Sequence, residues 1–122
     1  MSVRLILAAV ALGAAAACGS SSTPAMPTPP SGSTITVNIP SGATNLTTTA
    51  FGMNPLTVAR GAAVTWVNGD NTAHTATAND GMTFNSGILA AGGRFTFTFQ
   101  NAGTFPYRCT IHPNMVGTVM VQ

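Results

Sequence analysis

The sequence predicts an all-β fold, an antiparallel Greek-key β-sandwich or barrel, for residues 34–122. Three observations predict it. Short runs alternate between polar and apolar residues, turn residues such as Gly, Pro and Asn separate the runs, and no helical period of useful length follows the N-terminal leader. Many short strands at such spacing are typical of two packed sheets or a barrel. A stretch of this length can bury one small core, so we expect a single folded domain.

The first three expected strands lie between residues 34 and 68. Thr34–Ile39 alternates polar and apolar residues until the turn residues Pro40–Gly42 break the pattern. Leu56–Val58 and Ala63–Asn68 are two further apolar runs, separated by a turn at Arg60–Gly61.

The remaining expected strands follow the polar corner Asn68–Asn71. His74–Ala78 comes directly after this corner, and a glycine-containing loop separates it from Arg94–Phe99, which alternates cleanly with its three Phe on one face. A glycine then turns the chain into Thr104–Arg108, and Val116–Val121 closes the domain.

The aromatic residues of these runs are expected to form the core and receive no functional role. They are Trp66, Phe95, Phe97, Phe99 and Tyr107. Strand alternation also places Tyr107 and Cys109 on one face and turns Arg108 toward the opposite face.

The N-terminal segment, residues 1–18, resembles an export signal. Its apolar run from Leu5 to Ala17 is too short to span a bilayer, and small residues precede Cys18 as in bacterial lipoprotein signals, although Ala15 stands where such signals usually have Leu. We therefore expect a lipid-anchored protein that faces the periplasm or the cell exterior. The alternative is ordinary cleavage after Ala-x-Ala, with Cys18 incidental. Residues 19–33 are rich in Ser, Thr and Pro and read as a tether.

Charge is scarce in this chain. Charged residues make up 5% of the sequence, with four Arg, two Asp and neither Lys nor Glu. This composition provides no basic surface for binding nucleic acid and no long-range electrostatic attraction toward a charged partner. We therefore expect any protein partner to dock through short-range, largely apolar contacts.

The stretch from Cys109 to Met115 carries the candidate chemistry. It places a thiolate, an imidazole and a thioether three residues apart each time, at Cys109, His112 and Met115. Two His, one Cys and a weak axial Met form the blue-copper electron-transfer site. The chain has only one other histidine, His74, so the second imidazole must come from there. Zinc is a rival metal, but structural zinc sites rarely use Met.

An ordered set of motifs gives the chain a family resemblance. Pro55–Val58, Val64–Asn68, His74, Gly103–Cys109 and the C-x-x-H-x-x-M motif together resemble a cupredoxin of the plastocyanin or amicyanin type. The resemblance spans nearly all of residues 34–122. It implies one type 1 copper per chain, with His74, Cys109, His112 and Met115 as its ligands.

The resemblance also implies groups around the metal. Many cupredoxins have Asn directly after the first His, bridging to the ligand loop, whereas this chain has Thr75. Thr110 could hydrogen-bond toward the strand of His74 and so orient the sulfur of Cys109.

In the family, His112 has an edge near solvent inside an apolar docking patch. Pro113 suits the rim of that patch, and Met53, Phe51 and Ala91 are further candidates.

The leading functional hypothesis is a one-electron Cu(II)/Cu(I) carrier between a redox protein donor and acceptor outside the cytoplasm, acting as a monomer. An enzyme is not expected, because both histidines are used at one site and no Ser-His-Asp or paired-carboxylate arrangement is visible. Two alternatives stay open: a protein that stores or delivers copper, and a copper-free interaction module. An immunoglobulin-like domain is excluded, because it would need a second cysteine on an earlier strand.

Overall fold

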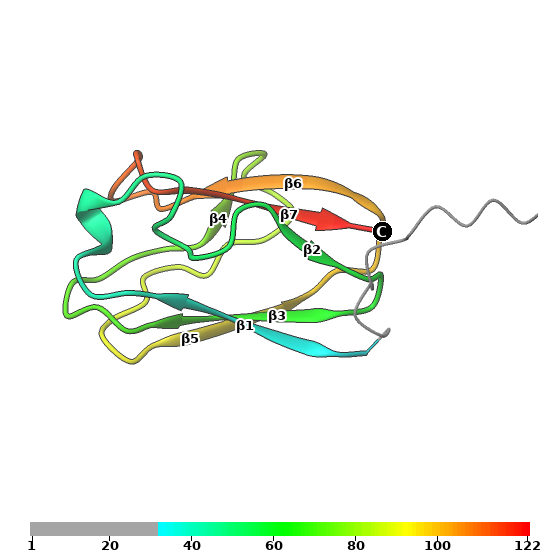
Figure 1. Cartoon of the computed structure of the whole chain (residues 1–122), viewed down its shortest axis with the longest axis horizontal. Coiled ribbons are helices and arrows are strands. Elements are labelled where there is room, and N and C mark those ends of the chain that lie inside the picture. The colour runs from blue at the N-terminus through cyan, green and yellow to red at the C-terminus, as the bar shows by residue number, and fades with distance from the viewer. Residues whose placement is uncertain (1–31) are drawn as a thin grey trace, which may run out of the picture.

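A computed structural model describes residues 32–122, which form two packed β-sheets (Figure 1). The predictions for residues 1–31, namely the export signal, the lipid on Cys18 and most of the tether, lie outside the described residues. Within residues 32–122, no helix has the length and apolar character needed to cross a bilayer.

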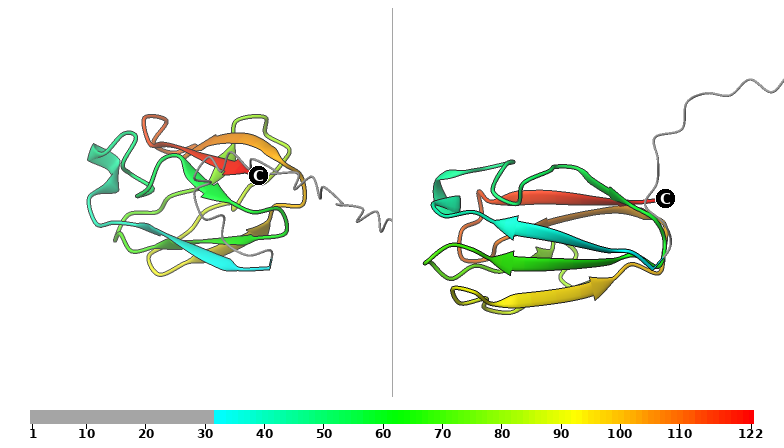
Figure 2. Two further views of the ribbon diagram at one scale, coloured as in Figure 1. Left: turned by 45° about the vertical axis from the view of Figure 1, so that its right-hand side comes forward. Right: turned by 60° about the horizontal axis from the view of Figure 1, so that its bottom comes forward.

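Each sheet takes its strands from several parts of the chain. The three-stranded sheet has the order β1-β3-β5, and the four-stranded sheet has the order β2-β7-β6-β4 (Figure 2). The strands in chain order are β1 Thr34–Ile39, β2 Leu56–Val58, β3 Ala63–Asn68, β4 Thr77–Ala78, β5 Arg94–Thr98, β6 Gly103–Arg108 and β7 Val116–Val121. Within residues 32–122, one 3₁₀ turn, η1, spans Ala43–Asn45. The prediction of an all-β sandwich is confirmed.

Strand direction differs from the prediction in two places. The expected antiparallel pairing occurs between β3 and β5, β4 and β6, and β6 and β7, but β1 pairs with β3, and β2 with β7, in parallel. The chain crosses to the other sheet at β2 before it returns as β3, so β1 and β3 run in the same direction. Both sheets are therefore mixed.

One expected strand is largely irregular. Of His74–Ala78, only Thr77 and Ala78 form regular strand, paired with β6. His74 instead makes an isolated bridge with Leu89, in which each backbone N–H donates to the other residue's carbonyl, at 3.0 and 2.8 Å. This bridge fixes the backbone of His74 without a continuous strand.

The core lies between the sheets and is rich in aromatic rings. Trp66, Tyr107 and Phe99 are buried as expected, while Phe95 and Phe97 are only partly buried against the same cluster. The rings of Trp66 and Tyr107 meet edge to face, with centroids 5.5 Å apart. Such edge-to-face pairs add stability beyond the apolar area they bury.

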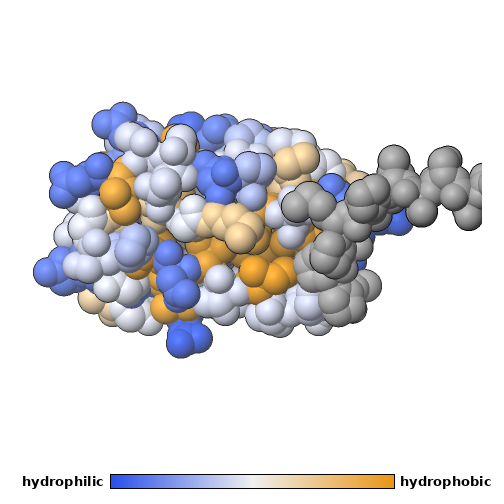
Figure 3. Space-filling view, in the orientation of Figure 1, coloured by the Kyte–Doolittle hydropathy of each residue, from blue (hydrophilic) through white to orange (hydrophobic). Residues whose placement is uncertain are grey.

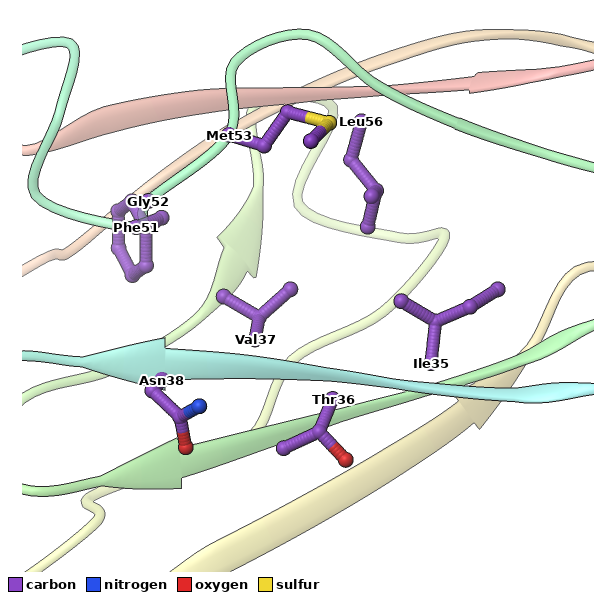
Figure 4. Close-up of a pocket in the computed structure, with 8 residues that line it drawn as sticks. All are labelled: Ile35, Thr36, Val37, Asn38, Phe51, Gly52, Met53 and Leu56. Carbon is purple, nitrogen blue, oxygen red and sulfur yellow. The ribbon is translucent and has the colours of Figure 1, made fainter.

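An apolar groove runs between the near edges of the two sheets, where Figure 3 shows hydrophobic residues gathered on the surface. It has a volume of about 290 Å³ and is lined by residues of β1 and of the segment that leads into β2 (Figure 4). None of the four predicted copper ligands lines it. Phe51 and Met53 do.

Candidate metal centre

Three of the four predicted ligands converge at one end of the sandwich. β3 and β6 both run toward this end, on the left in Figure 1, where the corner before His74 and the loop Cys109–Met115 lie. The ligand atoms of His74, Cys109 and His112 all lie within 4.8 Å of one another. The topology therefore brings together residues 35 or more positions apart in the chain.

The distances between these atoms fit a metal ion. The two Nδ1 atoms of His74 and His112 lie 3.2 Å apart, and the Sγ atom of Cys109 lies 3.9 Å from the first and 3.7 Å from the second. A point in the plane of these atoms is about 2.1 Å from each of them, which is close to ordinary metal–nitrogen and metal–thiolate distances. The cluster thus has the dimensions of a three-coordinate His₂Cys site.

Cys109 is a free and fully buried cysteine directly after β6. The backbone N–H of Thr75 donates to its Sγ atom at 3.3 Å. A hydrogen bond to the sulfur limits the directions its lone pairs can take. The sulfur is therefore held from the His74 side of the site.

Thr75 also ties the two ligand segments together. Its Oγ1 accepts a hydrogen bond from the backbone N–H of Thr110 at 2.8 Å and lies 3.1 Å from the Oγ1 of Thr110. The expected hydrogen bond from Thr110 toward the strand of His74 is confirmed. A threonine hydroxyl makes the bridge at the position where the family resemblance noted a departure from asparagine.

Met115 ends the ligand loop and is fully buried. Its backbone N–H donates to the carbonyl of His112 at 2.9 Å, and its own carbonyl accepts from the N–H of Cys109 at 3.0 Å. These two bonds close the loop on itself and limit how far its ends can separate. The assignment of Met115 as axial ligand stays a prediction.

Asp70 is the residue that the sequence reasoning missed. Its Oδ2 atom lies 2.9 Å from the Nε2 atom of His74, and the two side chains are almost fully buried, with 2% and 0% exposed. The hydrogen bond from His74 is the main cause that lowers the pKa of Asp70 from 3.8 to about 2. The signal available in the sequence was an Asp four residues before the candidate His, across a polar corner.

His112 is the more exposed of the two imidazoles. It is partly exposed, whereas His74 is fully buried, and its neighbours Ile111 and Pro113 are exposed. The expected rim residue Phe51 is only 1% exposed, so that prediction is wrong: its ring packs on Tyr107 in the core, with centroids 4.7 Å apart. Met53 is 74% exposed, but it lines the groove between the sheets.

The chain matches a family model described as copper binding proteins of the plastocyanin/azurin family, over residues 36–122. Among curated proteins, it is 32% identical to amicyanin of Paracoccus versutus over 71 residues, which is 55% of this chain and 54% of that protein. The match thus spans about half the length of that relative.

Solved structures give a longer match. A purple cupredoxin from Nitrosopumilus maritimus is 33% identical, with a TM-score of 0.66 over 72% of this chain and 99% of that one. A reduced Cu(I) form of an amicyanin variant is 28% identical, with a TM-score of 0.62 over 73% of this chain and 82% of that one.

Proposed function

Since this chain belongs to the plastocyanin/azurin family of copper-binding proteins, we propose that it carries single electrons between redox proteins. The observation that supports this proposal is the buried cluster of His74, Cys109 and His112, which is compatible with one type 1 copper per chain. We propose Met115 as the weak axial ligand.

The residues around the cluster suit a site that changes little when its charge changes. When bound, copper supplies one-electron Cu(II)/Cu(I) chemistry. Thr75 holds the sulfur of Cys109, the Leu89 bridge holds the backbone of His74, and the ligand loop is closed by its own backbone hydrogen bonds. Ligands held in this way need little rearrangement between two oxidation states.

The path for electrons is proposed to pass through the partly exposed edge of His112. Ile111, 43% exposed, and Pro113 lie beside it and supply apolar surface. Charged side chains are scarce in this protein, which favours an apolar contact over a charged one. We propose docking of a donor and an acceptor at this surface by a monomeric protein.

The proposed location rests on the sequence alone. The leader with Cys18 at its end supports an exported protein, anchored by lipid and facing the periplasm or the cell exterior. Radiolabelled fatty acid should be incorporated by the wild-type chain in its host and not by Cys18→Ser. Equal labelling of both would contradict the anchor.

Electrochemistry separates an electron carrier from a copper-delivery protein. A carrier should show reversible one-electron reduction and keep its metal in the reduced state when a Cu(I) chelator is added. A delivery protein should lose the metal to the chelator upon reduction. Cys109→Ser removes the thiolate and should abolish the reversible wave at the wild-type potential, and an unchanged wave would contradict the assignment.

A further inference from the structure

The two imidazoles of the cluster are held in different ways. The Nε2 atom of His74 faces a buried carboxylate oxygen of Asp70 at 2.9 Å. The Nε2 atom of His112 has no hydrogen-bond partner among residues 32–122, and its side chain is partly exposed. One ligand is therefore locked by a charged group, and the other is free on its outer edge.

Asp70 is itself held in place by its neighbours. The backbone N–H of Asn71 donates to its Oδ1 at 2.8 Å, while its own backbone N–H donates to the Oδ1 of Asn68 at 2.9 Å. Asn68, the last residue of β3, is 1% exposed. The carboxylate therefore sits on a fixed corner with one oxygen committed to the backbone and the other aimed at the ring of His74.

This geometry determines which ring nitrogen of His74 carries the proton. A carboxylate accepts hydrogen bonds, so Nε2 must be the donor. The lone pair of a neutral ring then lies on Nδ1, which is the atom that faces Cys109 and His112. A carboxylate in this position also fixes the orientation of the coordinating imidazole.

We propose that Asp70 is a positioning residue that holds His74 as its Nε2–H tautomer and lowers the reduction potential of the copper site through its buried negative charge. The inference rests on the proposed function for its redox part. The negative charge of Asp70 stabilises Cu(II) more than Cu(I), because Cu(II) carries one more positive charge. A neutral partner of the same shape would orient the ring without this electrostatic preference.

The test compares Asp70→Asn with Asp80→Asn. Both variants remove one negative charge, and these are the only two acidic side chains in the chain. Asp80 accepts hydrogen bonds from the N–H groups of Met82 and Thr83 in a turn of its own, not from the ring of His74. Loss of a partner carboxylate typically weakens metal binding roughly 10- to 100-fold. If only the oxidised state loses metal affinity by this factor, the reduction potential rises by about 59 mV for each tenfold loss of affinity.

We expect Asp70→Asn to raise the potential by at least one such increment relative to Asp80→Asn. Equal potentials in the two variants would overturn the redox part of the inference. The blue colour and reversible reduction of the wild-type protein test the proposed function separately, so the two can fail independently.

A second measurement covers the case in which Asp70→Asn does not fold. In ¹⁵N-edited NMR spectra of the metal-free wild-type protein, the ring of His74 should show a slowly exchanging proton on Nε2. A proton on Nδ1 instead would overturn the positioning role, whatever the copper site does. His112, whose Nε2 is unpartnered within residues 32–122, serves as the internal comparison and should show fast exchange.

Discussion

Asn68→Ala should destabilise the corner that carries Asp70 and His74. The buried side chain of Asn68 donates to the carbonyls of Thr72 and Leu89, at 2.8 and 2.9 Å, and accepts from the N–H of Asp70. In the variant, the carbonyl of Leu89 still accepts from the backbone N–H of His74, and the carbonyl of exposed Thr72 can accept from water. The buried N–H of Asp70 loses its acceptor, which costs about 1–3 kcal/mol. When the two hydrogen bonds donated by the Asn68 side chain are added, the expected loss in the free energy of unfolding is roughly 2–4 kcal/mol.

The measurement is urea unfolding of the metal-free protein, so that metal binding does not contribute to the stability. Asn38→Ala is the matched control. Asn38 is exposed on β1 and should change the unfolding free energy by less than about 0.5 kcal/mol. Equal stabilities of the two variants would show that the hydrogen bonds of Asn68 do not hold the corner.

Three further predictions concern single residues. Gly117→Ala should cost about 1–3 kcal/mol by urea unfolding, because its Cβ would lie 2.5 Å from the Cζ of buried Tyr107; wild-type stability would contradict this packing. The pKa of Asp80, measured by NMR titration, should lie below 3.8, because Thr83 donates hydrogen bonds to the carboxylate. The ionised carboxylate then stabilises the fold fully above pH 3.8, and this stabilisation is lost as the pH falls through the folded-state pKa. A pKa at or above 3.8 would contradict the turn geometry. Met115→Gln should shift the reduction potential while copper stays bound, and an unchanged potential and spectrum would contradict the axial assignment.

Local alternation of the sequence was enough to predict most strands. β1, β2, β3 and β7 have the predicted bounds, and β5 and β6 differ by one residue at one end. Alternation could not reveal which strands pair in parallel, because that depends on where the chain crosses between the sheets. It also could not show that His74 would be held by a bridge to Leu89, since this contact joins two irregular segments.

The candidate site was predictable where chemistry was rare in the sequence. Two histidines and one cysteine in residues 34–122 leave few ways to build a soft metal site, and the structure brings all three together. Asp70 was harder to predict, because an Asp in a polar corner is usually exposed to solvent. Phe51 was misplaced because its loop reaches the core between the sheets, a contact that no local pattern encodes.

Optical titration of the purified protein with Cu(II) tests the central claim most directly. A thiolate bound to copper in the His74, Cys109 and His112 cluster should give an intense visible absorption that saturates at one copper per chain. A protein that stays colourless through the addition of one equivalent would contradict the assignment of a blue-copper site.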